Sequence, residues 1–223
     1  GSMQAQDFSA ADVEVNEAII RVLEENGIEF VFGVPGGNAM HLFGALSQRR
    51  ETIRTIAVRH ESLAGVMAEV YGRLTGRPGV VMGQGLFILS NALLGVMEAM
   101  MGSTPMLVMT EMSDGAPFSH HAPYQAGTGD HGTWDAAKSF GAVSKETFIA
   151  HAAPQAVQLT QAAVRAAIQG QGGPATLIYH SDALKGKVGS AARPHLYSSQ
   201  SYCHPDPPCA SSENIAKALK VLN

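Results

Sequence analysis

The sequence of 223 residues has little cysteine and little charge, and it lacks a long apolar run. Its two cysteines, Cys203 and Cys209, flank His204, whereas a zinc site needs more ligands at tighter spacing, so we expect free thiols in a loop. No apolar run approaches the length of a membrane-spanning helix, so we expect no membrane partner. The net charge of -4 provides no basic face, so we do not expect nucleic acid as a partner.

Aliphatic side chains supply most of the hydrophobic character. Hydrophobic residues make up 45% of the chain and aromatic residues 6%, as in a globular protein with a large aliphatic core. Gly1 and Ser2 before Met3 look like the remnant of a cleaved expression tag. No secretory signal follows them, so we expect a cytoplasmic protein.

Segments of helical period alternate with short, continuous apolar runs. Such runs are typical of strands that a parallel sheet buries on both faces. We therefore predict an α/β fold, a doubly wound, mainly parallel sheet of about six strands with helices on both faces. The predicted strands are residues 30–34, 53–58, 79–82, 105–109, 142–148 and 175–180, and the predicted helices are residues 12–26, 38–48 (capped by Asn38), a helix beginning at Glu61, 88–101 and 153–169.

Changes in composition and periodicity along the chain predict the domain organisation. Residues 1–11 form the tag remnant and a tail, and residues 12–184 form one domain. Residues 185–210 are rich in Gly, Ser, Pro and His without periodicity, which indicates a linker. Residues 211–223 begin a new amphipathic helix, which we interpret as the start of a truncated second domain.

The stretch from Arg59 to Val81 contains a carboxylate where a strand gives way to a helix. Glu61 lies in the first turn of that helix, where the helix dipole favours an anion and where open α/β sheets bind ligands. Capping of the helix is the simpler interpretation of this residue. Small residues at helical spacing indicate that the helix packs very closely against a neighbour; they are Ala64, Gly65, Ala68 and Gly72.

Four motifs occur together in a recognisable order. They are Phe32 to Gly37, Arg59-His60-Glu61 followed by Arg73 to Gly76, Asn91 with Gly95, and Pro105 at the start of a strand. With these motifs, residues 13–184 resemble the N-terminal, pyrimidine-binding domain of the thiamine-diphosphate enzymes, in the group of acetolactate synthase and the 2-oxo acid decarboxylases.

The resemblance implies cofactor roles for particular residues. Glu61 would hydrogen-bond a ring nitrogen of the aminopyrimidine and favour its imino tautomer, which takes the proton from the thiazolium carbon; a carboxyl group in this role should be largely buried. Pro35, Gly36 and Gly37 would form the loop beside the cofactor, although a simple strand-to-helix turn explains them equally well. Phe87 and Asn91 would belong to the pyrimidine pocket. Phe87 lies in a segment, residues 86–90, that departs from the family's Gly-Pro-Gly-Ala-Thr sequence.

Paired histidines lie in a long loop between residues 114 and 135. His120 and His121 resemble the histidine pair of pyruvate and indolepyruvate decarboxylases, where imidazoles relay protons near neutral pH. His131 is a third candidate for this role. A solvent-exposed polar loop is the alternative interpretation.

The resemblance also implies what these residues lack. The family binds the diphosphate through Mg²⁺ in another domain, so we expect no metal ligands here, and the fragment alone should be inactive. The complete enzyme would act on a 2-oxo acid or related carbonyl compound as a homodimer or tetramer. A non-catalytic pyrimidine-binding module is the alternative function. A generic nucleotide-binding domain is disfavoured, because no Gly-x-Gly-x-x-Gly turn follows the first strand.

Overall fold

The computed structural model describes residues 12–113, 124–130, 132–189, 199–201 and 209–222. Cys203 and His204, which we expect in a loop, lie outside these residues.

A six-stranded sheet of order β3-β2-β4-β5-β7-β6 forms the centre of the fold, and all its neighbouring strands are parallel. This confirms the predicted α/β class. Since β3 and β4 lie on opposite sides of β2, the strand order reverses at β2, and ligands of open α/β sheets bind at such positions. The strands are β2 (Phe30–Gly33), β3 (Arg54–Ala57), β4 (Gly79–Met82), β5 (Met106–Met112), β6 (Glu146–Ala150) and β7 (Pro174–His180).

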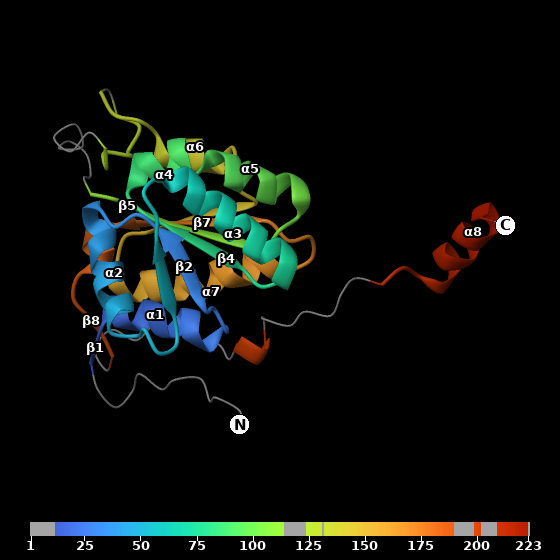
Figure 1. The fold of residues 1–223 in the computed structure, drawn as a ribbon, viewed down its shortest axis with the longest axis horizontal. Helices are drawn as coiled ribbons and strands as arrows, with labels where there is room; N and C mark the ends of the chain where they lie inside the picture. The colour runs from blue at the N-terminus through green and yellow to red at the C-terminus, as the bar shows by residue number, and fades with distance from the viewer. Residues whose placement is uncertain (1–11, 114–123, 131, 190–198, 202–208, 223) are drawn as a thin grey trace.

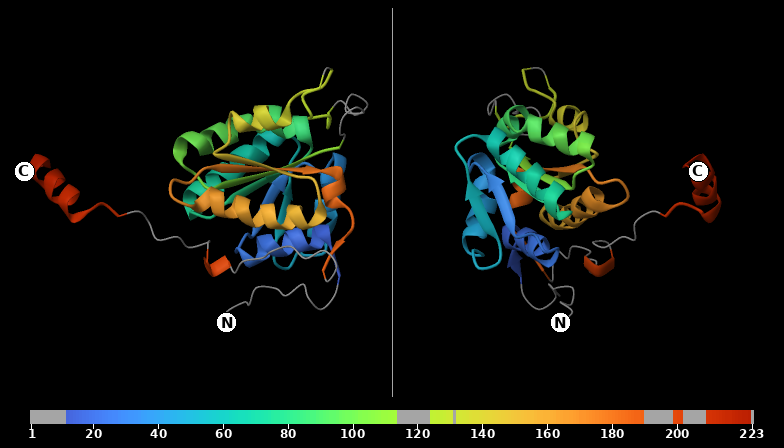
Figure 2. Two further views of the ribbon diagram at one scale, coloured as in Figure 1. Left: turned by 180° about the vertical axis from the view of Figure 1, so that it is seen from behind. Right: turned by 45° about the vertical axis from the view of Figure 1, so that its right-hand side comes forward.

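Helices cover both faces of this sheet, as the sequence predicts. Figure 1 shows α3, α4, α5 and α6 on one face and α1, α2 and α7 on the other, and the views in Figure 2 agree. Each face has its own cluster of buried, mainly aliphatic side chains. The helices are α1 (Val15–Glu25), α2 (Met40–Ser47), α3 (Glu61–Thr75), α4 (Gly85–Asn91), α5 (Leu93–Gly102), α6 (Ala136–Gly141) and α7 (Ala153–Ile168).

Short elements complete the described residues. The antiparallel pair β1 (Val13–Glu14) and β8 (Lys187–Val188) joins the two ends of the domain. The remaining helices are η1 (Gly37–Ala39), η3 (Ser181–Leu184), η4 (Ser199–Ser201) and α8 (Ser212–Leu222), of which α8 is exposed along its whole length.

Several predicted boundaries are wrong, for identifiable reasons. The helix predicted at residues 12–26 begins at Val15, because Val13 and Glu14 pair with β8. The strand predicted at residues 142–148 runs instead from Glu146 to Ala150, after α6. Asn38 does not cap α2, because it lies inside η1 and its side chain donates to Glu111.

The helix predicted at residues 88–101 is two helices. α4 ends at Asn91, and α5 begins at Leu93 after a bend of 61°. The bend directs α5 along α3, with which it packs closely. Among the described residues, no single helix is long and apolar enough to cross a membrane; α4 and α5 together reach the required length and composition, as core helices also do.

The small residues of α3 make the close contact that their spacing predicts. A Cβ atom on Gly95 of α5 would lie 2.2 Å from the carbonyl carbon of Gly65. A Cβ atom on Gly72 would lie 2.4 Å from the carbonyl oxygen of Pro105. The backbones therefore touch at both points, and α3 is fixed against α5 and the start of β5.

Candidate active site

The candidate site lies at the edge of the sheet where the parallel strands end. The turn after β2 carries Pro35, Gly36 and Gly37, and the segment after β3 leads directly to Glu61. The segment after β4 opens α4, and β5 ends beside Glu111. Because the sheet is parallel, these four strand ends share one edge of the molecule.

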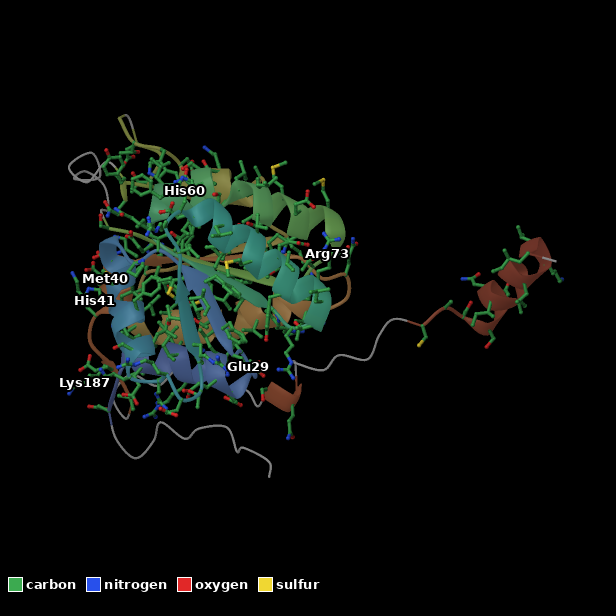
Figure 3. All side chains as sticks on the ribbon, viewed as in Figure 1. Glu29, Met40, His41, His60, Arg73 and Lys187 are labelled. Carbon is green, nitrogen blue, oxygen red and sulfur yellow. The ribbon has the colours of Figure 1, made fainter. Side chains whose placement is uncertain are left out.

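Glu61 is the first residue of α3 and is buried, with 9% of its surface exposed. The preceding residue, His60, caps the helix by accepting a hydrogen bond from the Ser62 N–H at 3.3 Å. In Figure 3, His60 lies at the end of α3 beside α4. The cap role that the sequence also allows for Glu61 therefore belongs to His60, and burial of Glu61 matches the expectation from the resemblance.

Asn91, the last residue of α4, points its side chain at Glu61. Its Nδ2 atom donates a hydrogen bond of 3.0 Å to Glu61 Oε2. The structure thus brings together two of the predicted cofactor-binding residues, which are 30 positions apart in the sequence. Their roles toward a cofactor stay predictions.

Phe87 lies on α4 four residues before Asn91 and is half-buried. Its ring centroid lies 5.2 Å from that of Tyr124, which follows β5 after residues outside the description. The residues that replace the family's proline-containing turn therefore form a regular helix, and Phe87 contacts the Tyr124 segment. Nothing here tests its predicted contact with the pyrimidine.

The turn formed by Pro35, Gly36 and Gly37 lies over the end of β5 and the residue before α4. Pro35 and Gly37 are exposed, and a Cβ atom on Gly36 would lie 3.2 Å from Gln84 Oε1. Gly37 has a φ angle of +53°, and a Cβ atom there would lie 2.5 Å from Glu111 Oε1. Glycine is therefore required at position 37 for two reasons, the backbone angle and the carboxyl group beneath it.

Glu111 is the residue of this edge that the sequence analysis misses. It is 1% exposed, and Asn38 Nδ2 donates to its Oε2 at 3.2 Å. Burial raises the pKa of Glu111 to about 6, although the hydrogen bonds from Asn38 and from the Gly85 N–H act in the opposite direction. The predicted strand ends at Met109, whereas β5 continues to Met112; the acidic residue before Met112 is the sequence signal that points to this position.

The predicted proton-relay residues His120, His121 and His131 lie outside the described residues. Within the described ranges, no three His, Cys, Asp or Glu side chains gather in a way that could hold a metal ion.

Known proteins match this chain in the region that carries the site. The sequence profile of the thiamine pyrophosphate enzyme N-terminal TPP binding domain matches residues 13–130, more than half of the 223 residues. This range includes the Pro35 turn, Glu61, Asn91 and Glu111.

Individual relatives cover part of the chain at moderate identity. The large subunit of acetolactate synthase from Buchnera aphidicola is 39% identical over 94 residues, 42% of this chain and 16% of that protein. Catabolic acetolactate synthase from Raoultella terrigena is 27% identical over 206 residues, 91% of this chain and 34% of that protein. A protein from Pseudomonas aeruginosa, named a probable 2-ketoarginine decarboxylase, is 34% identical over 103 residues, 45% of this chain and 18% of that protein.

The chain thus spans about a third or less of the length of these relatives. The profile match and the buried Glu61 at the start of α3 agree with the resemblance seen in the sequence. The chain belongs to the thiamine pyrophosphate enzymes, by way of their N-terminal TPP-binding domain.

Proposed function

We propose that this chain is the pyrimidine-binding part of a thiamine-diphosphate-dependent enzyme that makes or breaks a C–C bond next to the carbonyl of a 2-oxo acid or related compound. The observation that supports this most is the buried carboxyl group of Glu61, held by Asn91 at the edge where the strands end. The names of the relatives, acetolactate synthase and 2-ketoarginine decarboxylase, agree with this class of reaction.

The chemistry of Glu61 fits the cofactor. When bound, thiamine diphosphate supplies a carbon nucleophile that adds to the carbonyl group of the substrate. Glu61 Oε2 is occupied by the Asn91 amide, and within the described ranges no donor reaches Oε1. Oε1 is therefore the atom that would hold or receive a proton at the aminopyrimidine, and Asn91 would keep the carboxyl group in that orientation.

The finer assignments are part of the same proposal. Mg²⁺ and the diphosphate would be bound by a domain outside this chain. His120 and His121 would carry protons if the enzyme releases carbon dioxide and protonates the product. Substituting each histidine separately with Ala should slow decarboxylation in at least one variant; unchanged decarboxylation in both would remove the relay role.

An exposed apolar face supports a homodimer or tetramer. On α3 and α5, which pack side by side, eight large apolar side chains are exposed, an arrangement that soluble monomers avoid. We propose that a second copy of the chain covers this face, here called the α3–α5 face. Its residues are Leu63, Val66, Val70, Leu74, Leu94, Met97, Met100 and Met101.

The decisive experiment measures hydrogen–deuterium exchange at C2 of bound thiamine diphosphate in the complete gene product. The Glu61→Gln variant keeps the shape of the side chain but cannot hold the proton, so exchange should slow by orders of magnitude. Glu69→Gln is a matched control, because Glu69 is also buried and also lies on α3, in the middle of the helix. Exchange at the original rate in Glu61→Gln would remove Glu61 from the mechanism.

One observation favours the alternative, a non-catalytic module. α4 occupies the place of the proline-containing turn, which alters the surroundings of Asn91. Calorimetry with thiamine diphosphate and Mg²⁺ separates the two functions, because a non-catalytic module that has lost its ligand should show no binding.

A further inference from the structure

Burial of the ionisable side chain of Glu111 is unfavourable for folding. Its neighbours in β5, from Met106 to Met112, are all buried. Asn38 donates to Oε2, but Oε1 is buried and has no hydrogen-bond partner among the residues that the structure describes. A buried carboxylate with one unpaired oxygen opposes folding, so stability does not explain why an ionisable side chain is present.

The position of Glu111 indicates a different role. Its carboxyl group accepts hydrogen bonds from the backbone of Asn38 and from that of Gly85, and so connects η1 with the first residue of α4. Oε1 lies directly beneath Gly37, which is exposed. The turn of residues 36–38 therefore lies between this oxygen and the surface beside the candidate site, and the ribbon in Figure 1 shows β5 ending between α2 and α4.

We propose that Glu111 is a second ligand-binding residue of this site: its neutral acid keeps the turn of residues 36–38 closed, and its carboxylate opens the turn and presents Oε1 to a hydrogen-bond donor of the ligand. The identity of the ligand rests on the proposed function, whereas the motion of the turn does not. Linkage gives the direction, because a conformation that buries a carboxyl group favours the neutral form and one that hydrates it favours the carboxylate.

The titrating group can be identified as Glu111 itself. Among the described segments around it, η1 contributes Asn38 and α4 contributes Gly85, neither of which ionises. β7 contributes Tyr179, which pairs with Glu111 in the sheet and whose pKa is raised by burial, so this phenol is neutral. No charge on these residues contributes to the shift, and the pKa of about 6 for Glu111 puts the opening of the turn in the neutral range.

Amide hydrogen exchange tests the motion in the free protein. After correction for the intrinsic rate, the protection of the Asn38 and Gly85 amides should fall about tenfold or more between pH 4.5 and pH 7.5, from the shift in pKa. In Glu111→Gln, which cannot ionise, protection should not depend on pH. Protection that is independent of pH in the unsubstituted protein would overturn the proposal.

Proton release tests the contact with the ligand. Thiamine diphosphate and Mg²⁺ are titrated into the complete gene product at pH 6 in two buffers of different ionisation enthalpy. The unsubstituted protein should release up to about half a proton more than Glu111→Gln, because a group with a pKa of about 6 is half protonated at pH 6 and a donor at Oε1 favours its carboxylate. Glu69→Gln should behave like the unsubstituted protein.

The possible outcomes separate the two proposals. Equal proton release in the unsubstituted protein and in Glu111→Gln, with binding intact, would overturn the role of Oε1 and leave the proposed function standing. No binding to any variant would overturn the proposed function, and the amide exchange would then decide whether Glu111 controls the turn.

Discussion

At the scale of single residues, two buried glutamates at the edge of the sheet differ in their location and in their hydrogen bonds. Glu61 begins α3, and one of its carboxyl oxygens accepts a hydrogen bond from the Asn91 amide. Glu111 is the next-to-last residue of β5, and within the described residues its Oε1 has no hydrogen-bond partner. Both are joined to α4, Glu111 at Gly85 and Glu61 at Asn91. One short helix therefore orients both carboxyl groups.

The raised pKa of Glu111 predicts a pH dependence of stability. The group binds its proton more tightly in the folded protein, so its contribution is fully present below pH 4.5 and is lost as the pH rises to about 6. Between a pH well below 4.5 and a pH well above 6, the free energy of unfolding should fall by about 2 kcal/mol relative to Glu111→Gln. Urea unfolding at a series of pH values measures the difference.

A control keeps the measurement specific to burial. Glu51 is exposed, so Glu51→Gln should keep the pH dependence of the unsubstituted protein. Parallel curves for Glu111→Gln and the unsubstituted protein would show that Glu111 titrates at an ordinary pKa.

At the scale of elements, close packing of α3 against α5 holds Glu61 in place. Gly65 and Gly95 let the two backbones touch, and Gly72 does the same against Pro105. The bend between α4 and α5 then lets Asn91 reach Glu61 while α5 follows α3. The position of the carboxyl group thus depends on the glycines at which α3 touches its neighbours.

Gly95→Ala should destabilise the fold, because its Cβ would lie 2.2 Å from backbone atoms that cannot rotate away. Overpacking of this kind costs about 3 kcal/mol. Gly44→Ala in α2 is the matched control, since a Cβ there meets nothing within 4 Å, and it should stabilise the protein by about 0.5–1 kcal/mol. Thermal and urea unfolding measure both, and equal stability of the two variants would contradict the close contact.

At the scale of the whole molecule, the chain carries the proposed pyrimidine site and, separately, the exposed apolar α3–α5 face. The turn at Gly37, Glu61 and Glu111 occupies one edge of the sheet, while the α3–α5 face extends from the first turn of α3 along both helices. A second copy on that face would bury its apolar side chains close to Glu61.

Charge on the α3–α5 face should therefore break the assembly. Leu74 and Met101 are 79% and 71% exposed, so replacing both with Glu should leave folding intact and reduce the mass in solution to that of one chain. Light scattering after size-exclusion chromatography of the complete gene product measures this mass. Val221→Glu is the control, because Val221 is 85% exposed but lies on α8. An unchanged mass in the double variant would place the contact elsewhere.

The sequence by itself determined the fold class and the positions of most strands, and it predicted Glu61 as a site residue. Continuous apolar runs are a local signal of buried parallel strands, and β4 lies at residues 79–82 as predicted. The small residues of α3 likewise predicted a close contact, because their spacing is a property of one helix.

Only the tertiary structure decided which residues share the site. The contact of Asn91 with Glu61 depends on the bend after α4, and that bend follows from the packing of α5 on α3 rather than from local preference. Glu111 belongs to this edge because β5 runs to Met112 and passes beneath the turn at Gly37. Burial and pairing of a side chain are set by segments distant in the sequence, which is why its chemistry could not be deduced from its neighbours along the chain.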